Sequence, residues 1–347
     1  MCYFKQQQPT LVGAFLHCKA ERSRQRISTA KLVCVKGNMS KQLDVLGLGA
    51  VAVDDVIYVA SYPPADSKAR VLGRHRRFGG LTGVALISAA RLGGSCAYAG
   101  VLGHDELSLF ALNSLKAENI DVSSVKQTSL ARPVHSNIVV DERRGTRNIF
   151  FDEAGVVGAR SDVSARLITS SRVLFIDNLG VNGMIRAARL ARKAGVPVVA
   201  DLESSHEPAF HELLKLADHL IISRAFATKL TGKASARLSV CSLAASGHEI
   251  SVVTCGADGC WYMVRGWKAP KHHKAFKVNA VDTTGCGDVF HGAYAFGLAR
   301  NMSLEERVRL ASGTAALKAS GAAGLAGIPS YEKVRRFLKD EQNSQTH

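Results

Sequence analysis

The chain has 347 residues, of which 46% are hydrophobic, so it is long enough to bury one large core or two smaller ones. Charged residues make up 21%, and no apolar run approaches the roughly 20 residues of a membrane span, which argues against bulk disorder and a transmembrane helix. The net charge of +16 leaves a nucleic-acid binder open. The eight cysteines form no C-x-x-C pair, so we expect reduced thiols in a cytoplasmic protein and no zinc site.

Residues 1–40 differ in character from the rest of the chain. They have no sustained periodicity, and their basic residues are opposed by Glu21 alone. We interpret them as a basic N-terminal extension that is not part of the fold. Translated sequence upstream of a start at Met39, a targeting peptide and a basic arm are three explanations that the sequence leaves open. The folded domain is expected to span residues 41–340.

Strand and helix patterns alternate from residue 41 onward. We expect strands at 43–49, 95–101, 172–177, 196–201, 219–223, 250–255 and 276–281, and helices at 106–118, 183–194, 287–300 and 303–318. This alternation predicts an α/β fold with a mostly parallel central sheet and helices on both faces. Two further segments, 56–78 and 134–151, have the pattern of short strands separated by turn residues. We expect them to form a small β-sheet inserted into the α/β core.

The strongest chemical signal is the run DTTGCGDVFHGA from Asp282 to Ala293. A glycine-rich turn that leads into a helix directs its backbone N–H groups at one point, where they can bind an anion. Gly285 and Gly287 allow a ligand to approach the backbone closely. Asp288, at the mouth of this cradle, is suited to accept a proton from an attacking hydroxyl. An acid in a first helical turn also stabilises the helix, so a purely structural role for Asp288 remains the alternative.

This run resembles the C-terminal signature of the ribokinase-like (PfkB) carbohydrate kinases, D-T-x-G-A-G-D followed by F-x-G-A, with Cys286 in place of the usual alanine. Further resemblances are Gly79 and Gly80 to the N-terminal signature, and Thr254, Gly256 and Gly259 to the nucleotide turn. The resemblance covers residues 43–338. It implies a ribokinase-like three-layer fold in which a small β-sheet forms a lid over the sugar.

The resemblance also implies an activity and a set of site residues. The activity is ATP-dependent transfer of the γ-phosphate to a hydroxyl of a small carbohydrate, with Mg²⁺ and, in many members, K⁺. By resemblance, Asp288 is the base, the backbone at Gly285, Cys286 and Gly287 is the anion hole, and Thr254, Gly256 and Gly259 bind the nucleotide. The implied sugar-binding residues are Asp54, Lys68, Gly79 and Gly80. The implied monovalent-cation site consists of Asp282 and Thr284 with the backbone at Ala319, Gly324 and Gly327. Two copies are expected to pair through the lid.

The chain departs from the family pattern at two places. Val84 stands where the family has an asparagine that contacts a sugar hydroxyl, so one polar contact is missing. Ser223 and Phe226 stand where the N-x-x-E motif organises Mg²⁺ and phosphate. Metal handling must then depend on the nucleotide and on other acids, for which Asp201 and Glu203 are the candidates.

The bacterial sulfofructose kinase subgroup also lacks N-x-x-E, and this chain is similar to it at Ala311–Lys318 and Ala326–Pro329. Lys68 matches the lid lysine that this subgroup uses for the sulfonate. The other anion-contacting positions of the subgroup fall near Phe151 and Leu179, which do not bind anions. The sequence therefore resembles the subgroup without supporting a sulfonate substrate.

Arginines are dense in both lid segments, at Arg70, Arg74, Arg76, Arg77, Arg143, Arg144 and Arg147. They either form a solvated sheet edge or capture an anionic sugar or the phosphates of ATP. A sugar kinase is the leading hypothesis, and a non-catalytic sugar- or nucleotide-binding regulator is the alternative. No basic stripe with interleaved aromatic residues is present, so we expect a small-molecule partner, with neither nucleic acid nor membrane.

Overall fold

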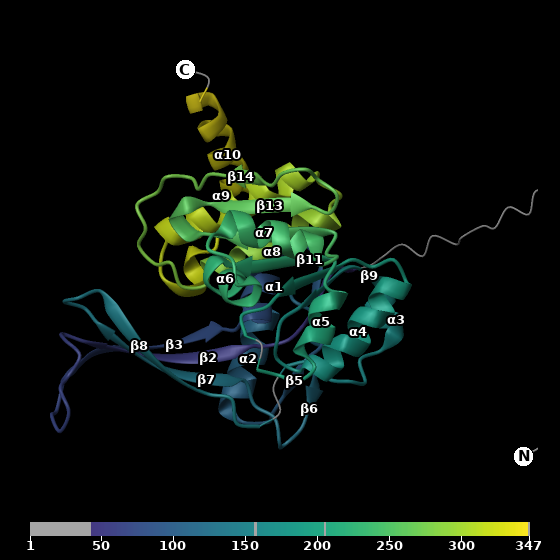
Figure 1. Cartoon of the computed structure of the whole chain (residues 1–347). Helices are drawn as coiled ribbons and strands as arrows, with labels where there is room; N and C mark the ends of the chain where they lie inside the picture. Colours follow the sequence, from purple (N-terminus) through teal and green to yellow (C-terminus); the bar gives the residue numbers. More distant parts are fainter. Residues whose placement is uncertain (1–42, 156–157, 205, 346–347) are drawn as a thin grey trace, which may run out of the picture. The chain divides into compact units, whose positions relative to one another are not determined.

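The computed structural model describes residues 43–345 except 156, 157 and 205 (Figure 1). The expected N-terminal extension, residues 1–40, lies outside the described residues. An eight-stranded sheet has the order β14-β13-β12-β11-β10-β9-β1-β4. Its strands are β1 (Leu43–Leu48), β4 (Cys96–Tyr98), β9 (Ser171–Ile176), β10 (Val198–Asp201), β11 (His219–Ser223), β12 (Ile250–Thr254), β13 (Cys260–Val264) and β14 (Lys271–His273). All pairings from β4 to β12 are parallel, and β13 and β14 are antiparallel additions, so the predicted mostly parallel sheet is confirmed.

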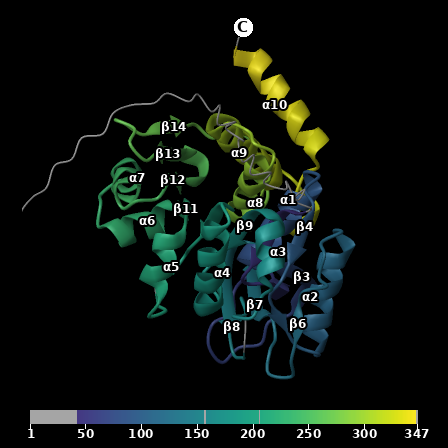
Figure 2. The same ribbon diagram turned by 90° about the vertical axis from the view of Figure 1, so that its right-hand side faces the viewer.

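Helices cover both faces of this sheet, as the sequence predicts (Figure 2). They are α1 (Leu81–Arg91), α2 (Glu106–Ala117), α3 (Ala165–Ser170), α4 (Val181–Lys193), α5 (Phe210–Leu216), α6 (Arg224–Thr231), α7 (Ala236–Ala245), α8 (Cys286–Ala299), α9 (Leu304–Ser320) and α10 (Tyr331–Gln345), with short 3₁₀ turns at Gly256–Asp258 and Gly324–Gly327. Successive strand residues point to opposite faces. Val45 accordingly packs with α1 and α8, whereas Leu46 packs with α4. None of the helices in the described part is long and apolar enough to cross a membrane.

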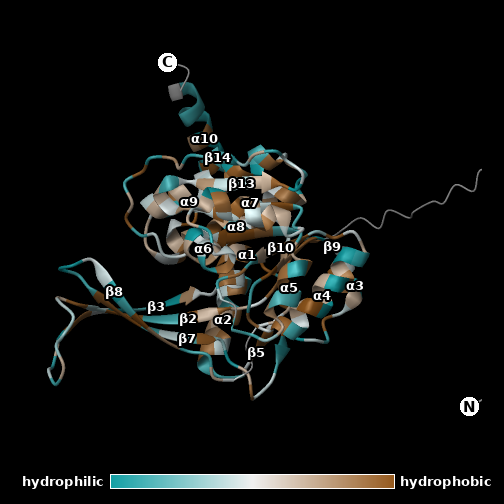
Figure 3. Ribbon diagram, in the orientation of Figure 1, coloured by the Kyte–Doolittle hydropathy of each residue, from teal (hydrophilic) through white to brown (hydrophobic). Residues whose placement is uncertain are grey.

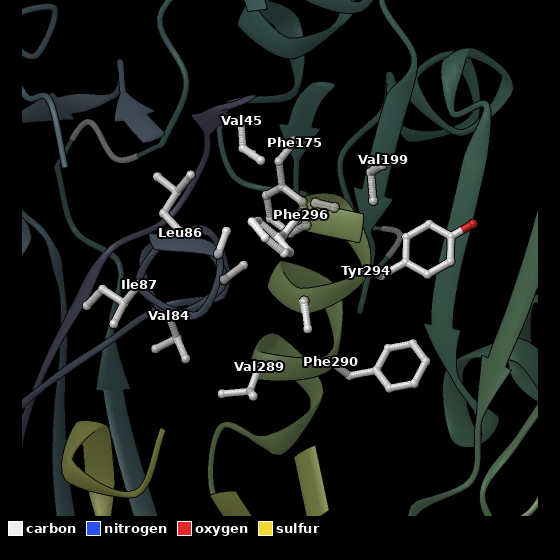
Figure 4. Packing of buried hydrophobic residues seen from close by; sticks show 14 of the residues in the cluster. Val45, Val84, Leu86, Ile87, Phe175, Val199, Val289, Phe290, Tyr294 and Phe296 are labelled. Carbon is white, nitrogen blue, oxygen red and sulfur yellow. The ribbon is translucent and has the colours of Figure 1, made fainter. Parts of the chain in front are cut away.

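Helix α8 packs on strands β1 and β9 of the sheet and against helices α1 and α9, and it is apolar around most of its circumference (Figure 3). In Figure 4, Phe296 of α8 lies near Phe175 of β9, and Tyr294 of α8 and Leu86 of α1 belong to the same cluster. This burial fixes the helix firmly. Its N-terminus, which carries the glycine-rich turn, is therefore held in a defined position.

A second sheet of four strands, in the order β3-β2-β7-β8, projects from the main body (Figure 1). Its strands are β2 (Ala52–Val59), β3 (Val71–Gly79), β7 (Val134–Asp141) and β8 (Thr146–Asp152). These strands come from the two segments that the sequence assigned to a small β-sheet. We refer to this sheet as the lid.

Two predicted strands differ in the structure. The strand expected at 276–281 is absent, because β14 ends at His273 and the chain then leaves the sheet as an extended segment. The Val281 N–H instead donates to the Ala319 carbonyl, 2.7 Å away, at the end of α9. The strand expected at 95–101 is divided into β4 and β5 (Val101–Leu102), because β5 pairs with β6 (Lys126–Gln127) outside the main sheet.

Candidate active site

The glycine-rich turn directly precedes α8. Gly285 is the N-cap residue and has φ 74° and ψ 5°, a left-handed conformation that favours glycine. Gly287 lies in the first turn of the helix, and a Cβ added there would meet no atom within 4 Å. The first N–H groups of a helix have no partner within the regular helical pattern, so such a turn can present donors to a ligand. In this structure the Cys286 N–H donates to the Thr283 carbonyl at 3.3 Å.

Two cavities lie on either side of this turn. The lid cavity, about 450 Å³, is bounded by lid residues together with Asp282, Thr284, Gly285 and Asp288. The second cavity, about 560 Å³, is bounded by Thr283, Cys286 and Gly287 on the same turn. Neighbouring residues of one short segment thus face different cavities. A ligand in the lid cavity and a ligand in the second cavity would therefore meet at the glycine-rich turn.

Asp288 faces the lid cavity beside the turn, and its Oδ2 is 3.7 Å from the position of a Cβ on Gly285. Burial, followed by the negative charges of Asp201 and Glu203, raises the pKa of Asp288 well above its ordinary value. A carboxylate with a raised pKa is a better proton acceptor near neutral pH. The geometry therefore suits the base role that the sequence indicated.

Asp54, on lid strand β2, also borders the lid cavity, and its Oδ2 is 2.8 Å from the position of a Cβ on Gly79. Glycine at this position is needed to leave room for the carboxylate. Gly80 has φ 93° and packs directly on the backbone of Val51. Burial raises the pKa of Asp54, although the Ser136 hydroxyl and the charge of Arg77 act in the opposite direction. Asp54 thus lies opposite Asp288 as a second acceptor for hydroxyl groups.

The second cavity contains all three predicted nucleotide-binding residues, Thr254, Gly256 and Gly259. Its other walls are mainly small or apolar, and include Phe276, Phe290 and Ala315. An apolar slot beside a cradle of N–H groups has the shape and polarity that a purine with attached phosphates requires.

Residues 44–329 match the pfkB family carbohydrate kinases. The chain belongs to this family. Ribokinase from Haemophilus influenzae is 26% identical over 87% of this chain and 99% of its own length, and fructokinase-2 from Zea mays is 29% identical over 81% and 87%. Among solved structures, the ribokinase of Arabidopsis thaliana complexed with ribose and ATP superposes with a TM-score of 0.78, at 21% identity over 86% of this chain and 99% of that one. The expected ribokinase-like fold and carbohydrate kinase class, which transfers phosphate to a hydroxyl, are confirmed.

Within this PfkB-family kinase, the lid arginines divide between two faces. Arg77 lines the lid cavity, and its guanidinium donates to the Tyr58 hydroxyl at 2.6 Å. Arg147 of β8 also lines it and donates to the Thr284 hydroxyl at 2.9 Å, so the lid contacts the turn directly. Arg76 instead pairs with Asp55 at 2.8 Å on the other side of β3. The structure therefore brings two of the predicted arginines to the lid cavity.

Other predicted residues lie elsewhere. Lys68 is exposed in the β2–β3 connection and does not line the lid cavity. Val84 lines that cavity as an apolar wall. Phe226, at the position of the family glutamate, is buried and packs edge-on against Phe210 with ring centroids 6.0 Å apart, while Ser223 caps α6. Among the described residues, no group of three His, Cys, Asp or Glu side chains could hold a metal ion.

The residues of the implied cation site do lie together, but oxygens of Asp282, Thr284 and Ala319 already have protein partners. Asp282 Oδ1 accepts the Thr284 N–H at 2.9 Å, and Oδ2 accepts the Gly324 N–H at 3.0 Å. The Ala319 carbonyl accepts N–H groups from Val281 and Asp282. Gly327 packs against the Ala322 carbonyl. This arrangement does not fit a bound K⁺.

Sequence reasoning missed two residues, Lys318 of the lid cavity and the buried Asp177, whose charge acts on Asp288. Asp177 follows β9 and accepts hydrogen bonds from the Ala50 N–H at 2.7 Å and the Thr82 hydroxyl at 2.8 Å, which ties β1 and α1 to the sheet edge. Burial raises its pKa to about 6. Lys318 lines the lid cavity and bonds to Asp282. An acid directly after a buried parallel strand was a usable signal for Asp177, but nothing in the sequence shows which way Lys318 points.

Proposed function

We propose that this kinase transfers the γ-phosphate of MgATP to a hydroxyl group of a small anionic sugar held under the lid. The observation that carries the proposal is the turn 282–288, which lies between two cavities. Asp288 borders the lid cavity, and the backbone of the turn borders the lid cavity at Gly285 and the second cavity at Gly287. ATP occupies the second cavity, and the sugar occupies the lid cavity against Asp54 and the Gly79-Gly80 turn.

The reaction follows from this placement. The sugar hydroxyl oxygen attacks the γ-phosphorus, the bond from that phosphorus to the β–γ bridging oxygen breaks, and ADP leaves. Asp288 accepts the hydroxyl proton, and the N–H groups at Gly285, Cys286 and Gly287 stabilise the negative charge on the transferred group. Mg²⁺, carried with the nucleotide, would neutralise phosphate charge. Asp201 and Glu203, the acids that the sequence singled out for the metal, border neither of the two cavities.

Two guanidinium groups favour an anionic substrate. Arg77 and Arg147 project into the lid cavity from β3 and β8, and each is tied to the site through a single neutral hydroxyl, on Tyr58 and Thr284. Neither hydroxyl carries a charge, and the Asp54 carboxylate on the neighbouring strand offsets the charge of Arg77 only in part. A sugar acid or a phosphorylated sugar would supply that charge, because guanidinium binds carboxylate and phosphate through paired hydrogen bonds.

A substrate panel tests this proposal. ADP release is measured with neutral sugars, sugar acids, phosphorylated sugars and nucleosides. We expect kcat/KM to be highest for an anionic sugar and to fall at least about tenfold in Arg77→Met, with the Arg74→Met variant on the opposite face as the control. Equal turnover of neutral sugars would contradict the anionic assignment. Binding of sugar and nucleotide without any ADP release would instead identify a non-catalytic binding protein.

Pairing of two copies through the lid is the expected assembly. β8 is an outer strand of the lid, and its Ile149, Phe150 and Phe151 are 48%, 55% and 66% exposed. Exposed apolar edge strands tend to pair with another chain. Light scattering should give a dimer for the wild type and a monomer for Phe151→Lys. Leu238→Lys, at an exposed leucine of α7, is the control, and a monomeric wild type contradicts the proposal.

We assign the protein to the cytoplasm. Within the described residues, the cysteines are free thiols, at Cys96, Cys241, Cys255, Cys260 and Cys286. Free thiols are usual in a reducing compartment. Fractionation of cells that express the full chain tests the assignment, and recovery in an oxidising compartment would contradict it.

A further inference from the structure

Lys318, near the end of α9, points into the polar cluster beneath the glycine-rich turn. Its side chain is 2% exposed. The ammonium group donates to two oxygens of one residue, the Asp282 carboxylate Oδ2 and the Asp282 carbonyl, each at 3.0 Å. The same carboxylate accepts the Thr284 and Gly324 N–H groups. One buried cation therefore links the turn before α8 to the end of α9 and the 3₁₀ turn at Gly324–Gly327.

A buried ammonium is stable only when it is paired and hydrogen-bonded, because its removal from water is costly. Asp282 supplies both the negative charge and a carbonyl. Burial opposes ionisation of Asp282, but the two N–H groups and Lys318 outweigh it and lower the pKa of Asp282 below its ordinary range. The contacts of Asp282 with Lys318, Thr284 and Gly324 fix the direction of the backbone at the start of the turn.

We propose that the Lys318 ammonium is a tethered monovalent cation that takes the place of the K⁺ implied by the family resemblance, so that this kinase works without K⁺. It binds a carboxylate and a backbone carbonyl, which are the oxygen ligands that such an ion would use. A tethered charge is present at every salt concentration, whereas a bound ion follows mass action. Lys318 is a positioning residue in this account, because it acts on the turn and not on the reacting atoms.

The activity part of this inference rests on the proposed kinase function, so the test has two readouts. Protein freed of K⁺ is assayed for ADP release and for Tm in choline, Na⁺, K⁺ and NH₄⁺ chlorides at equal ionic strength. We expect the wild type to vary by less than about twofold in kcat and to keep the same Tm. A clear rise of both in K⁺ over Na⁺ would overturn the proposal.

Two variants separate the charge from the packing of the side chain. Lys318→Ala leaves a hole, and Lys318→Met fills much of it with an uncharged chain. We expect both to lose at least about tenfold in kcat in choline. Methylammonium, NH₄⁺ or K⁺ should restore activity and raise Tm in Lys318→Ala but not in Lys318→Met. Lys271→Ala, at an exposed lysine paired with Glu305, is the matched control and should not respond.

The remaining outcomes also decide the matter. If Lys318→Ala ignores every cation and mainly raises KM for the sugar, Lys318 contacts substrate and the proposal is wrong. If Lys318→Ala does not fold, the wild-type salt series and Lys318→Met still provide the decision. If no sugar is phosphorylated in any salt, the proposed function fails, while the Tm response of Lys318→Ala still tests the cation site by itself.

Discussion

Replacing Asp288 by asparagine tests the proton acceptor directly. Asp288→Asn keeps the shape of the side chain and removes the charge that accepts the proton. The carboxyl lies beside the start of the turn, with Oδ2 3.7 Å from the Cβ position of Gly285. General-base catalysis contributes about 10²–10⁴-fold, which corresponds to about 3–5 kcal/mol of transition-state stabilisation. We therefore expect kcat to fall by at least about a hundredfold.

The acid cluster adds a pH signature to this prediction. Burial raises the pKa of Asp288 first, and the charges of Asp201 and Glu203 raise it further. The base acts in its ionised form, so kcat/KM should fall as the pH drops below this raised pKa. Glu203→Gln removes one negative charge, lowers the pKa of Asp288 and should move the acid limb to lower pH. Because Glu203 is exposed and screened, we expect this shift to be small.

The assay is ADP release over a pH series, with nucleotide affinity measured separately by calorimetry. The nucleotide Kd should change little in Asp288→Asn, because the second cavity does not contain Asp288. Asp162→Asn, at an exposed acid paired with Arg160, is the matched control. Near-normal turnover of Asp288→Asn would refute the base assignment. Loss of nucleotide binding alone would place Asp288 among the groups that bind the metal.

Three further predictions concern stability. Burial, Glu203 and Asp177 raise the pKa of Asp201, so the folded state loses stability as the pH rises above the pKa of this aspartate in the unfolded chain. Asp201→Asn should therefore raise Tm near about pH 8 and raise it less near about pH 4. Equal Tm differences at the two pH values would contradict this. Phe226→Ala should cost about 3–5 kcal/mol in urea unfolding, with KM for ATP unchanged, since the buried ring packs on Phe210; a loss well under 1 kcal/mol would contradict its core role. Deleting residues 1–38 should leave Tm and kcat unchanged, because this segment lacks the periodicity needed to bury a face, and a large drop in Tm would show that it joins the core.

The central parts of the fold and site were predictable because their signals are local. A buried strand is a short apolar run, and the turn before α8 places its glycines and Asp288 within a few residues of one another. Segment 276–281 shows where this reasoning fails. Its apolar residues alternate as in a strand, but Phe276 lines the second cavity and Val281 is 71% exposed, so the alternation is used for a cavity wall and not for sheet pairing.

Residues that act through long-range contacts could not be placed from the sequence. Arg77 and Arg76 are neighbours with the same chemistry, yet only Arg77 lines the lid cavity, because alternate residues of β3 point to opposite faces. The register of β3 had to be known before the two could be distinguished. Lys318 is a similar case, since its partner Asp282 is 36 residues away and belongs to a different element.

The departures from the family pattern all replace groups that contact the sugar, the metal or the monovalent ion in the family. Val84 puts an apolar wall where the family has a polar sugar contact, and Phe226 puts a core ring where it has a metal-organising acid. Lys318, as proposed, replaces a dissociable ion with part of the chain. The turn and Asp288 keep the family pattern. Because the glycine-rich turn and Asp288 are retained while Val84, Phe226 and Lys318 differ, we infer that this kinase keeps the phosphoryl-transfer chemistry while its substrate contacts and ion requirements have diverged.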